Sequence, residues 1–550
     1  MHRSTSVLLA LCFAGSAAAV SAQSAATPPP KAPAPAATPA PAARVEGQPI
    51  EVGSDQTPWQ QYMKQYYKIY KVPKKMAVRQ SDGTVWPSAY LKSPMEVVKE
   101  DDDYLYLRNL PIEDPRSSNH KAWLAHQYQQ IRIEERLQNL KGKIVIDPTA
   151  PFAPLPYTDL LELTDASKGL PDQGQWQTGL AVVDINHDGL LDLVVPPARG
   201  EHSTPHVVLQ QKDGSWRQLE VQWPKEVPWD YGDVVAADFD GDGTIDLAFG
   251  IHFKSSWVVY GVPGSGGAKF DRPQELPRVN GTVTSRALAV GDFNKDGRPD
   301  LAVLGELDID MSTNLQLGNG LVTVVLNTPG GWRPVDLGAK RVFGDHVKVA
   351  DFDGDGWPDV LCSKNTNEDT PFLFLNRDAG TRWVGVPPTG IPWMPYVFGV
   401  GAVRREGRPP LAALAAMQSV RWEGSLHQVN TLLLADLAED GSLKQTAELL
   451  RKDGVYFSAL GVGDLDGDGR DDVVVGDERG NLRIFLNWGG TWVEEKCPEL
   501  PAREAWISNI LVTDLDGDGH NEIVVEATSA KEPGYIRVYR VAKRTAPTLP

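Results

Sequence analysis

The nine residues DFDGDGTID, from Asp238 to Asp246, decide how this chain folds, because the chain contains six versions of them. The other five, DINHDGLLD, DFNKDGRPD, DFDGDGWPD, DLDGDGRDD and DLDGDGHNE, begin at residues 184, 292, 351, 464 and 514. Each has Asp or Asn at positions 1, 3 and 5, Gly at position 6 and an acid at position 9. Oxygen ligands at alternate positions, followed by a glycine that permits a sharp turn, are typical of a calcium-binding loop. Six such loops, each between hydrophobic β-rich segments, predict both calcium binding and a repeat fold.

The spacing of the loops reveals a seventh unit that lacks the acids. Successive loops start 54, 54, 59, 113 and 50 residues apart, and the interval of 113 residues is long enough for two units. Within it, GAVRREGRPPLA at 401–412 aligns without gaps on GDFNKDGRPDLA at 291–302. The glycine is kept, whereas the ligand positions hold Ala402, Arg404, Glu406 and Pro410. We expect the Arg404 guanidinium to take the place of the ion in this unit and to pair with Glu406.

Every unit has the same order of short hydrophobic segments, which predicts four antiparallel β-strands. In the second unit, strands are expected before the loop at 234–237 and after it at 245–249. A more apolar third strand follows, such as 321–327 in the third unit, and then a fourth that often carries a tryptophan: Trp216, Trp332, Trp383 and Trp492. Seven such units predict an all-β fold, a seven-bladed β-propeller with calcium-binding DxDxDG loops.

The two ends of the repeat region are expected to meet. The last unit stops after its third strand, at 535–541. The segment YTDLLELT at 157–164 lies about 20 residues before the first loop, where fourth strands lie before the other loops. We therefore expect this segment to complete the seventh blade and close the ring, which removes exposed sheet edges.

The six loops and their flanking strands, over roughly residues 151–545, resemble the FG-GAP or VCBS repeats, best known from the seven-bladed propellers of integrin α subunits. The resemblance implies one Ca²⁺ in each loop, hence about six sites and none in blade five. The implied ligands are the side chains at positions 1, 3, 5 and 9 and the backbone carbonyl at position 7. For the six loops in turn, positions 1, 3, 5, 7 and 9 are Asp184, Asn186, Asp188, Leu190 and Asp192; Asp238, Asp240, Asp242, Thr244 and Asp246; Asp292, Asn294, Asp296, Arg298 and Asp300; Asp351, Asp353, Asp355, Trp357 and Asp359; Asp464, Asp466, Asp468, Arg470 and Asp472; Asp514, Asp516, Asp518, His520 and Glu522. The family includes adhesion receptors, lectin-like proteins and lyases, so the resemblance says little about activity.

An EF-hand is the alternative calcium motif, and the sequence argues against it. An EF-hand needs a Glu at position 12 and flanking helices. Position 12 of the six loops is instead apolar and lies in an expected strand: Val195, Phe249, Val303, Cys362, Val475 and Val525. Asp-Gly is also common in simple hairpin turns, but six copies with acids at the same positions favour calcium.

The N-terminal part differs in composition from the repeats. Residues 1–22 read as an export signal, with Arg3, an apolar segment from Val7 to Val20 and small residues up to Ala22. Cys12 leaves a lipoprotein signal as a weaker alternative. Residues 23–50 form an Ala/Pro-rich linker. We expect a small α+β domain of unknown role over 51–148, with helices at 59–70 and 117–140 and strands at 95–98 and 104–107, and the propeller over 149–550.

Charge and cysteine content limit the function further. The formal net charge of −18 argues against nucleic-acid binding, and no segment is long and apolar enough for a membrane span. Besides Cys12, the chain has only Cys362 and Cys497, which fall in non-neighbouring units, so we expect no disulfide between them. An exported protein without disulfides must be stabilised in another way, and calcium is the evident candidate.

Function is expected on the face opposite the calcium loops, where connections between second and third strands converge. The polar residues of those connections are Arg199, Glu201, His202, His206, His252, Lys254, Glu306, Asp308, Asp310, Lys364, Arg421, Trp422, Asp477, Glu478, Arg479, Lys531 and Glu532. We favour a periplasmic or extracellular scaffold that binds a protein or glycan partner at the cell envelope. The alternative is a polysaccharide lyase or hydrolase built around His202, His252, Asp308 and Arg421. The chain contains neither a G-x-S-x-G nor an H-E-x-x-H motif, so no residue is assigned a catalytic role.

Overall fold

A computed structural model of the chain describes residues 70–86, 94–110, 143–177, 179–200, 203–279, 284–306, 309–310, 315–316, 322–339, 342, 344–365, 370–422, 425–497, 505–529 and 533–544. Within these residues every regular element is a β-strand, so the predicted all-β fold class is confirmed. The export signal, the linker and the helix expected at 117–140 lie outside the described residues. The helix expected at 59–70 also lies outside them, except for Tyr70, which begins a strand.

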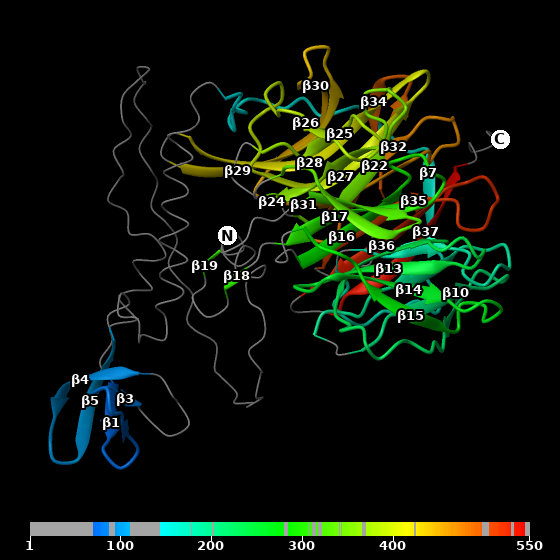
Figure 1. Cartoon of the computed structure of the whole chain (residues 1–550). Helices are drawn as coiled ribbons and strands as arrows, with labels where there is room; N and C mark the ends of the chain where they lie inside the picture. The colour runs from blue at the N-terminus through cyan, green and yellow to red at the C-terminus, as the bar shows by residue number, and fades with distance from the viewer. Residues whose placement is uncertain are drawn as a thin grey trace, which may run out of the picture.

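The N-terminal region contains one small antiparallel sheet, blue in Figure 1. Its strands are ordered β1-β5-β4-β3-β2, with the bounds β1 (Tyr70–Pro73), β2 (Val78–Arg79), β3 (Val85–Trp86), β4 (Met95–Glu100) and β5 (Tyr104–Asn109). The expected strand pair is confirmed, because β4 and β5 are antiparallel neighbours with Val97 opposite Leu107. Val85, Met95, Leu105 and Leu107 form the core of this sheet.

Apart from the hairpin of β18 and β19, the remaining described strands form seven larger sheets, which we number I to VII. Sheet I contains β8 (Ala181–Val183), β9 (Asp192–Val195), β10 (His206–Gln210) and β11 (Trp216–Leu219). Sheet II contains β12 (Gly232–Ala237), β13 (Asp246–Ile251), β14 (Ser256–Gly261) and β15 (Phe270–Glu275). Sheet III contains β16 (Thr284–Gly291), β17 (Asp300–Glu306), β20 (Val322–Thr328) and β21 (Gly331–Asp336), and a separate hairpin of β18 (Ile309–Asp310) and β19 (Leu315–Gln316) lies between β17 and β20 in the chain.

The other four sheets are also built mainly from strands that follow one another in the chain, and three of them include a strand from elsewhere in the sequence. Sheet IV contains β22 (Val347–Ala350), β23 (Asp359–Cys362), β25 (Leu373–Asn376) and β26 (Trp383–Gly385). Sheet V contains β24 (Lys364–Asn365), β27 (Tyr396–Arg405), β28 (Arg408–Trp422), β29 (Ser425–Leu437) and β30 (Leu443–Asp453). Sheet VI contains β31 (Phe457–Gly463), β32 (Asp472–Asp477), β33 (Leu482–Trp488), β34 (Thr491–Glu495) and β6 (Tyr157–Thr158). Sheet VII contains β35 (Trp506–Thr513), β36 (Glu522–Thr528), β37 (Tyr535–Lys543) and β7 (Leu161–Asp165).

Hydrophobic clusters join each sheet to the next one. For example, one cluster combines residues of sheets I and II, another those of sheets VI and VII. The cluster that contains Leu193 and Val208 of sheet I also contains Val524 and Ile536 of sheet VII. The last sheet therefore packs against the first, and Leu191 N donates to Leu515 O between them at 3.0 Å.

Two strands from the start of the repeat region join its last two sheets. Strand β7 pairs antiparallel with β37 and completes sheet VII, as predicted, and the cyan and red strands lie side by side in Figure 1. The first residues of the expected strand behave differently, because β6 pairs in parallel with β34 and adds a fifth strand to sheet VI. Glu495 accepts a hydrogen bond from Leu161 N at 2.9 Å, which fixes the chain where it crosses from one sheet to the other.

Sheet V is the seventh unit predicted from the spacing. Its first two strands meet in a tight hairpin at Glu406 and Gly407, where Gly407 has a φ of 62°, so the nine-residue loop is replaced by a two-residue turn. Residues just before the expected boundary at 149 pack against this sheet. Ile146 lies in the cluster between sheets IV and V, and both its backbone N and O are hydrogen-bonded to the Gln418 side chain at 3.0 Å.

Candidate metal sites and the opposite face

The six acidic loops have one backbone geometry. In each loop the N–H at position 6 donates to the carboxylate at position 1, as Gly243 N does to Asp238 Oδ2 at 2.8 Å. The N–H at position 7 donates to position 5, as Thr244 N does to Asp242 Oδ1 at 2.8 Å. The glycine at position 6 has a positive φ in every loop, for example 85° at Gly243. Glycine is therefore required there by the left-handed backbone.

Position 4 is a second left-handed residue, which our reading of the sequence did not single out. It is Gly in four loops, and it is His187 or Lys295 in the other two, with φ values of 60° and 53°. These are the two loops that have Asn at position 3, namely Asn186 and Asn294. The sequence shows that every loop with Asp at position 3 has Gly at position 4. The loops therefore fall into two types, four with Asp-Gly and two with Asn followed by His or Lys.

The acid at position 9 holds the loop to the rest of its sheet. Asp246 is fully buried; its Oδ2 accepts from Phe239 N at 2.9 Å and its Oδ1 from Gly261 N, on the third strand, at 2.8 Å. In the absence of an ion, burial raises the pKa of this position to about 6 in three loops and about 7 in the other three: Asp192, Asp246 and Asp300, then Asp359, Asp472 and Glu522. The residue at position 2 is apolar and buried beside it, as Phe239 is. Position 9 therefore has a structural task besides any contact with an ion.

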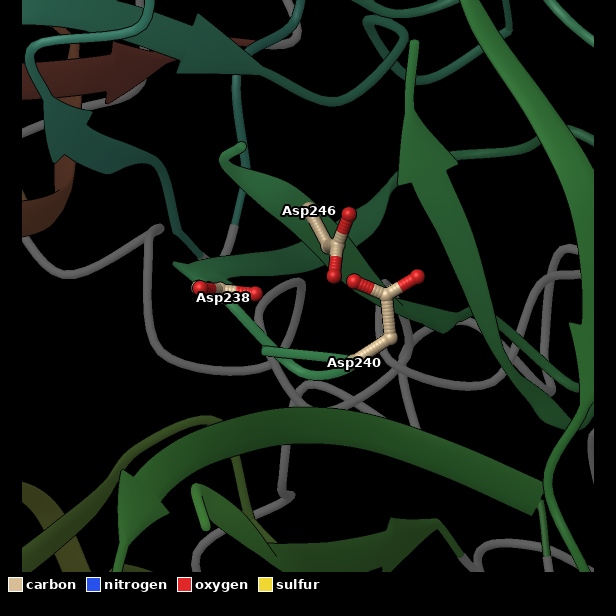
Figure 2. A group of neighbouring side chains, drawn as sticks. All are labelled: Asp238, Asp240 and Asp246. Atoms are coloured by element: carbon tan, nitrogen blue, oxygen red, sulfur yellow. The ribbon is translucent and has the colours of Figure 1, made fainter. Parts of the chain in front are cut away.

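In four of the loops, three carboxylates offer oxygens within 4.8 Å of one another. The groups are Asp238, Asp240 and Asp246; Asp351, Asp353 and Asp355; Asp464, Asp466 and Asp472; Asp514, Asp516 and Glu522. Figure 2 shows the first of them, where the carboxylates of Asp240 and Asp246 point toward one another beside Asp238. Hard carboxylate oxygens at this separation fit a divalent cation such as Ca²⁺. In the other two loops Asn186 and Asn294 supply amide oxygens at the same position.

The degenerate hairpin of sheet V corrects one expectation. Arg404 does not pair with Glu406; it binds Asp471 of sheet VI, with Nη2 at 2.6 Å from Oδ1. The neighbouring Arg405 binds Asp436 on β29 through two hydrogen bonds of 2.7 and 2.9 Å. The expected pair fails because a two-residue hairpin turn directs the Arg404 side chain to the adjacent sheet and away from its own turn.

On the opposite face, three side chains, one from each of three sheets, lie against one aromatic ring. The Tyr231 ring, in the segment leading to β12, contacts the His252 ring in a tilted arrangement, with centroids 4.2 Å apart and an angle of 33° between the planes. The Arg199 and Arg286 guanidinium carbons lie 5.4 and 5.9 Å from the same ring centroid. Arg286 also forms an ion pair with Asp345, in the segment leading to β22. This cluster, which we call the Tyr231 cluster, combines two guanidiniums, an imidazole and a phenol.

Two of the other polar residues expected on this face have partners outside that cluster. Lys254 Nζ lies 3.1 Å from Asp230, and Asp477 accepts from Asn481 and Arg479. Sequence reasoning named Arg199 and His252 and missed Tyr231 and Arg286, which stand at or just before the start of first strands and carried no motif. Glu201, His202, Asp308, Lys531 and Glu532 lie outside the described residues, as does the side chain of Arg421.

Ionisable groups on first and second strands also lie inside the ring of sheets. Burial raises the pKa of Asp233 on β12 to about 7, and it raises the pKa of Glu526 on β36 to about 8. Asn509 Nδ2 donates to Glu526 Oε2 at 3.1 Å. Burial lowers the pKa of Lys348, whereas the charge of Asp233 acts in the opposite direction. Because its pKa is about 8, Glu526 is mainly protonated at neutral pH.

Two further observations bear on stability and location. Cys362 and Cys497 are both free thiols, as expected. Among the described residues, no helix is long and apolar enough to cross a membrane.

Comparison with known proteins finds a family whose repeat matches part of the ring. The family described as FG-GAP-like repeat matches residues 464–525, which run from the loop of sheet VI into β36 of sheet VII. The chain is also similar to cartilage acidic protein 1 from Mus musculus, with 30% identity over 162 residues. This match covers 28% of the chain and 23% of the length of that relative.

Proposed function

Because this chain carries FG-GAP-like repeats, we propose that it is an exported, calcium-stabilised seven-bladed β-propeller that binds a protein or glycan partner at the cell envelope. The proposal is supported by seven consecutive sheets, antiparallel except where β6 joins sheet VI, and by the hydrophobic cluster between the last sheet and the first. Six of the seven contain an acidic loop between their first two strands. Repeat folds of this kind commonly supply a rigid frame, while function resides in the connecting segments.

Calcium would be held by the loop carboxylates and would have a structural task. Side chains at positions 1, 3 and 5 would surround the ion, and the buried acid at position 9 would link the ion to the third strand. The ion supplies two positive charges to a site that otherwise holds several acids within a few ångströms. The residues themselves arrange the site, because backbone N–H groups already orient the oxygens of positions 1, 5 and 9, as Gly243 and Phe239 do for Asp238 and Asp246.

The observation that carries the binding function is the Tyr231 cluster. It combines Arg199, Tyr231, His252 and Arg286 on the face away from the acidic loops. Arginine and aromatic side chains are the residues that most often dominate recognition surfaces, and they suit both acidic protein segments and acidic sugars. Phe253, a residue that is 36% exposed, lies next to His252 with ring centroids 3.9 Å apart, whereas Tyr231 is buried.

The test is a comparison of partner capture by matched variants. Full-length calcium-loaded protein would be used for capture from the envelope fraction of the native source and on a glycan array. We expect Arg199→Ala and His252→Ala to lose most of the captured partner. Arg217→Ala, at an exposed arginine on β11, is the control and should bind like the wild type.

Unchanged capture by both cluster variants, with melting temperatures equal to wild type, would contradict the assignment of the binding face. Turnover of a polysaccharide that is lost in His252→Ala would favour the enzymatic alternative instead. Export is tested separately, by locating the full-length protein and a variant that lacks residues 2–22 in cell fractions. Retention of both in the same fraction would contradict the export signal.

A further inference from the structure

Four arginines form ion pairs with acids at position 3 or position 5 of the acidic loops, in addition to the pair of Arg404 with Asp471 at position 8. Arg272 Nη2 lies 2.8 Å from Asp240, and Arg540 Nη2 lies 3.0 Å from Asp516; both acids are at position 3. Arg377 binds Asp353 at position 3 and also Asp355 at position 5, the latter at 2.7 Å. Arg470 binds Asp468, at position 5 of its own loop. The loops concerned are those of sheets II, IV, VI and VII, which all have Asp at position 3.

The loops of sheets I and III, with Asn at position 3, have a different arrangement. Asn186 Nδ2 donates to Asp188 Oδ2 at 3.0 Å, and Asn294 Nδ2 donates to Asp296 Oδ2 at 3.0 Å. Among the described residues, no arginine or lysine forms an ion pair with an acid of these two loops. Lys295, within the second of them, instead lies over the Trp357 ring of the next sheet, 4.4 Å from its centroid.

The two arrangements give the same charge. A loop with four acids at positions 1, 3, 5 and 9 has a formal charge of −4, and one paired arginine brings it to −3. A loop with Asn at position 3 has three acids at these four positions, and therefore −3 without a paired arginine. Lys295 and Arg298, which lie within the loop of sheet III, are left out of the count because, in the part of the chain that the structure describes, they form no ion pair with these acids. Within this count, all six loops present −3 to an ion.

The arginines do not come from one position of the repeat. Arg272 is on a fourth strand, Arg540 on a third strand, Arg377 directly after a third strand, and Arg470 inside the loop. A shared ancestral residue would occupy one position in all units, so inheritance from the repeat does not explain the four pairs. The four arginines share only their contact with a loop that has four acids at positions 1, 3, 5 and 9.

At Arg272 the backbone departs from the regular strand to make the contact. The pairing of β14 with β15 shifts register between Val258 and Tyr260, and Arg272 has a left-handed φ of 45°. A bulge of this kind redirects a side chain, and the left-handed backbone is unfavourable for a residue other than glycine. The guanidinium then covers the Tyr260 ring, 4.6 Å from its centroid, and reaches Asp240.

We propose that Arg272, Arg377, Arg470 and Arg540 are charge-balancing residues that set the four-acid loops to the same net charge as the Asn loops. The proposal rests on calcium binding by the loops and adds how their affinities are matched. In the calcium-free protein each arginine offsets repulsion between the acids. In the loaded protein it prevents a four-acid loop from binding its ion more tightly than the three-acid loops do. The six sites then fill over one narrow range of calcium concentration.

Arg540→Gln is the test variant, because Arg540 contacts one acid only and its side chain is 47% exposed. We expect its calcium-free form to melt at a lower temperature than wild type, and one site to bind calcium roughly tenfold more tightly. The number of ions bound per chain should not change. Calorimetric titration with CaCl₂ and melting curves in chelator give the two readouts, and Arg217→Gln is the control for loss of an exposed arginine.

The charge itself is tested by a rescue. Asp516→Asn combined with Arg540→Gln recreates the composition of the Asn loops, so calcium affinity and chelated melting temperature should return to wild-type values. Asn186→Asp adds a fourth acid to a loop that has no arginine, so it should reproduce the effects of Arg540→Gln in sheet I. Unchanged affinity and unchanged chelated stability in both Arg540→Gln and Asn186→Asp would overturn the proposal. Absence of calcium binding by the wild type would overturn the proposed calcium function and this inference together.

Discussion

Arg404 and Asp471 join two neighbouring sheets by a bidentate pair that uses both the side chain and the backbone of the arginine. Arg404 N donates to Asp471 Oδ2 at 2.7 Å, while Nη2 and Nε donate to Oδ1 at 2.6 and 3.0 Å. The carboxylate is almost fully buried, with 2% of Asp471 exposed, although most of the Arg404 side chain is in solvent. In sheet V, which has no acidic loop, this pair connects the hairpin to the loop of sheet VI.

The first prediction concerns this pair. Arg404→Ala leaves a buried carboxylate with one backbone donor, so we expect a loss of about 2 kcal/mol in the free energy of unfolding. Urea denaturation with calcium present measures it, and Arg217→Ala should change the value by less than about 0.5 kcal/mol. A loss no greater than that of the control would show that the buried carboxylate does not depend on the guanidinium.

The second prediction concerns removal of the ions. Each site saturated at a hundred times its dissociation constant contributes about 2.7 kcal/mol to stability. Transfer from calcium to a chelator should therefore lower the melting temperature by more than about 5 °C. Differential scanning calorimetry measures the change, with excess magnesium as the control for ionic strength. Equal melting temperatures in calcium and chelator would contradict structural calcium.

The third prediction separates two roles within one loop. Asp246→Asn replaces an acceptor of two backbone N–H groups, so it should cost about 1–3 kcal/mol both with calcium and in chelator. Asp240→Asn removes an acid whose partners are Asp242 N within the loop and the Arg272 side chain. Among the described residues this acid accepts from no backbone N–H of a strand, so its substitution should lower stability only when calcium is present. Melting curves of the two variants in both buffers decide the matter. Equal responses of the two variants would mean that position 9 has no separate structural role.

The fourth prediction concerns pH. Burial raises the pKa of Glu526 to about 8, from an ordinary value of 4.5, so the folded protein retains a proton that the unfolded chain releases above about pH 4.5. Below pH 4.5 Glu526 is protonated in both states and does not lower the free energy of unfolding. Between pH 4.5 and 8 the free energy of unfolding falls as pH rises, and above pH 8 the loss stays constant. Glu526→Gln removes this loss and keeps an acceptor for Asn509.

The stability gained by Glu526→Gln should thus increase with pH, by at most about 1.4 kcal/mol per pH unit for one proton, and level off above pH 8. Denaturation of both proteins at pH 5, 6, 7, 8 and 9 measures the difference, which cancels pH effects common to the two. A difference that does not change with pH would contradict the raised pKa.

Local patterns predicted most of the strands and the shape of the loops. The glycine at position 6 was expected to allow a sharp turn, and it is left-handed in all six loops, as at Gly243. The strand pair at Val97 and Leu107 was also expected, because short β-rich segments flank a polar turn. Sequence reasoning failed at Arg404, since alignment with the other loops placed it near Glu406 whereas a hairpin turned it toward Asp471.

The amino-acid sequence by itself determined that this chain is built from a repeated all-β unit with acidic loops, because ligand spacing, glycine positions and strand patterns are all set within a few residues. Only the tertiary structure decided which arginine meets which loop, how β6 and β7 divide between the last two sheets, and that Arg199, Tyr231, His252 and Arg286 meet. These contacts join residues of different strands and sheets. Their formation depends on the register and twist of whole sheets packed in a ring, which no local segment specifies.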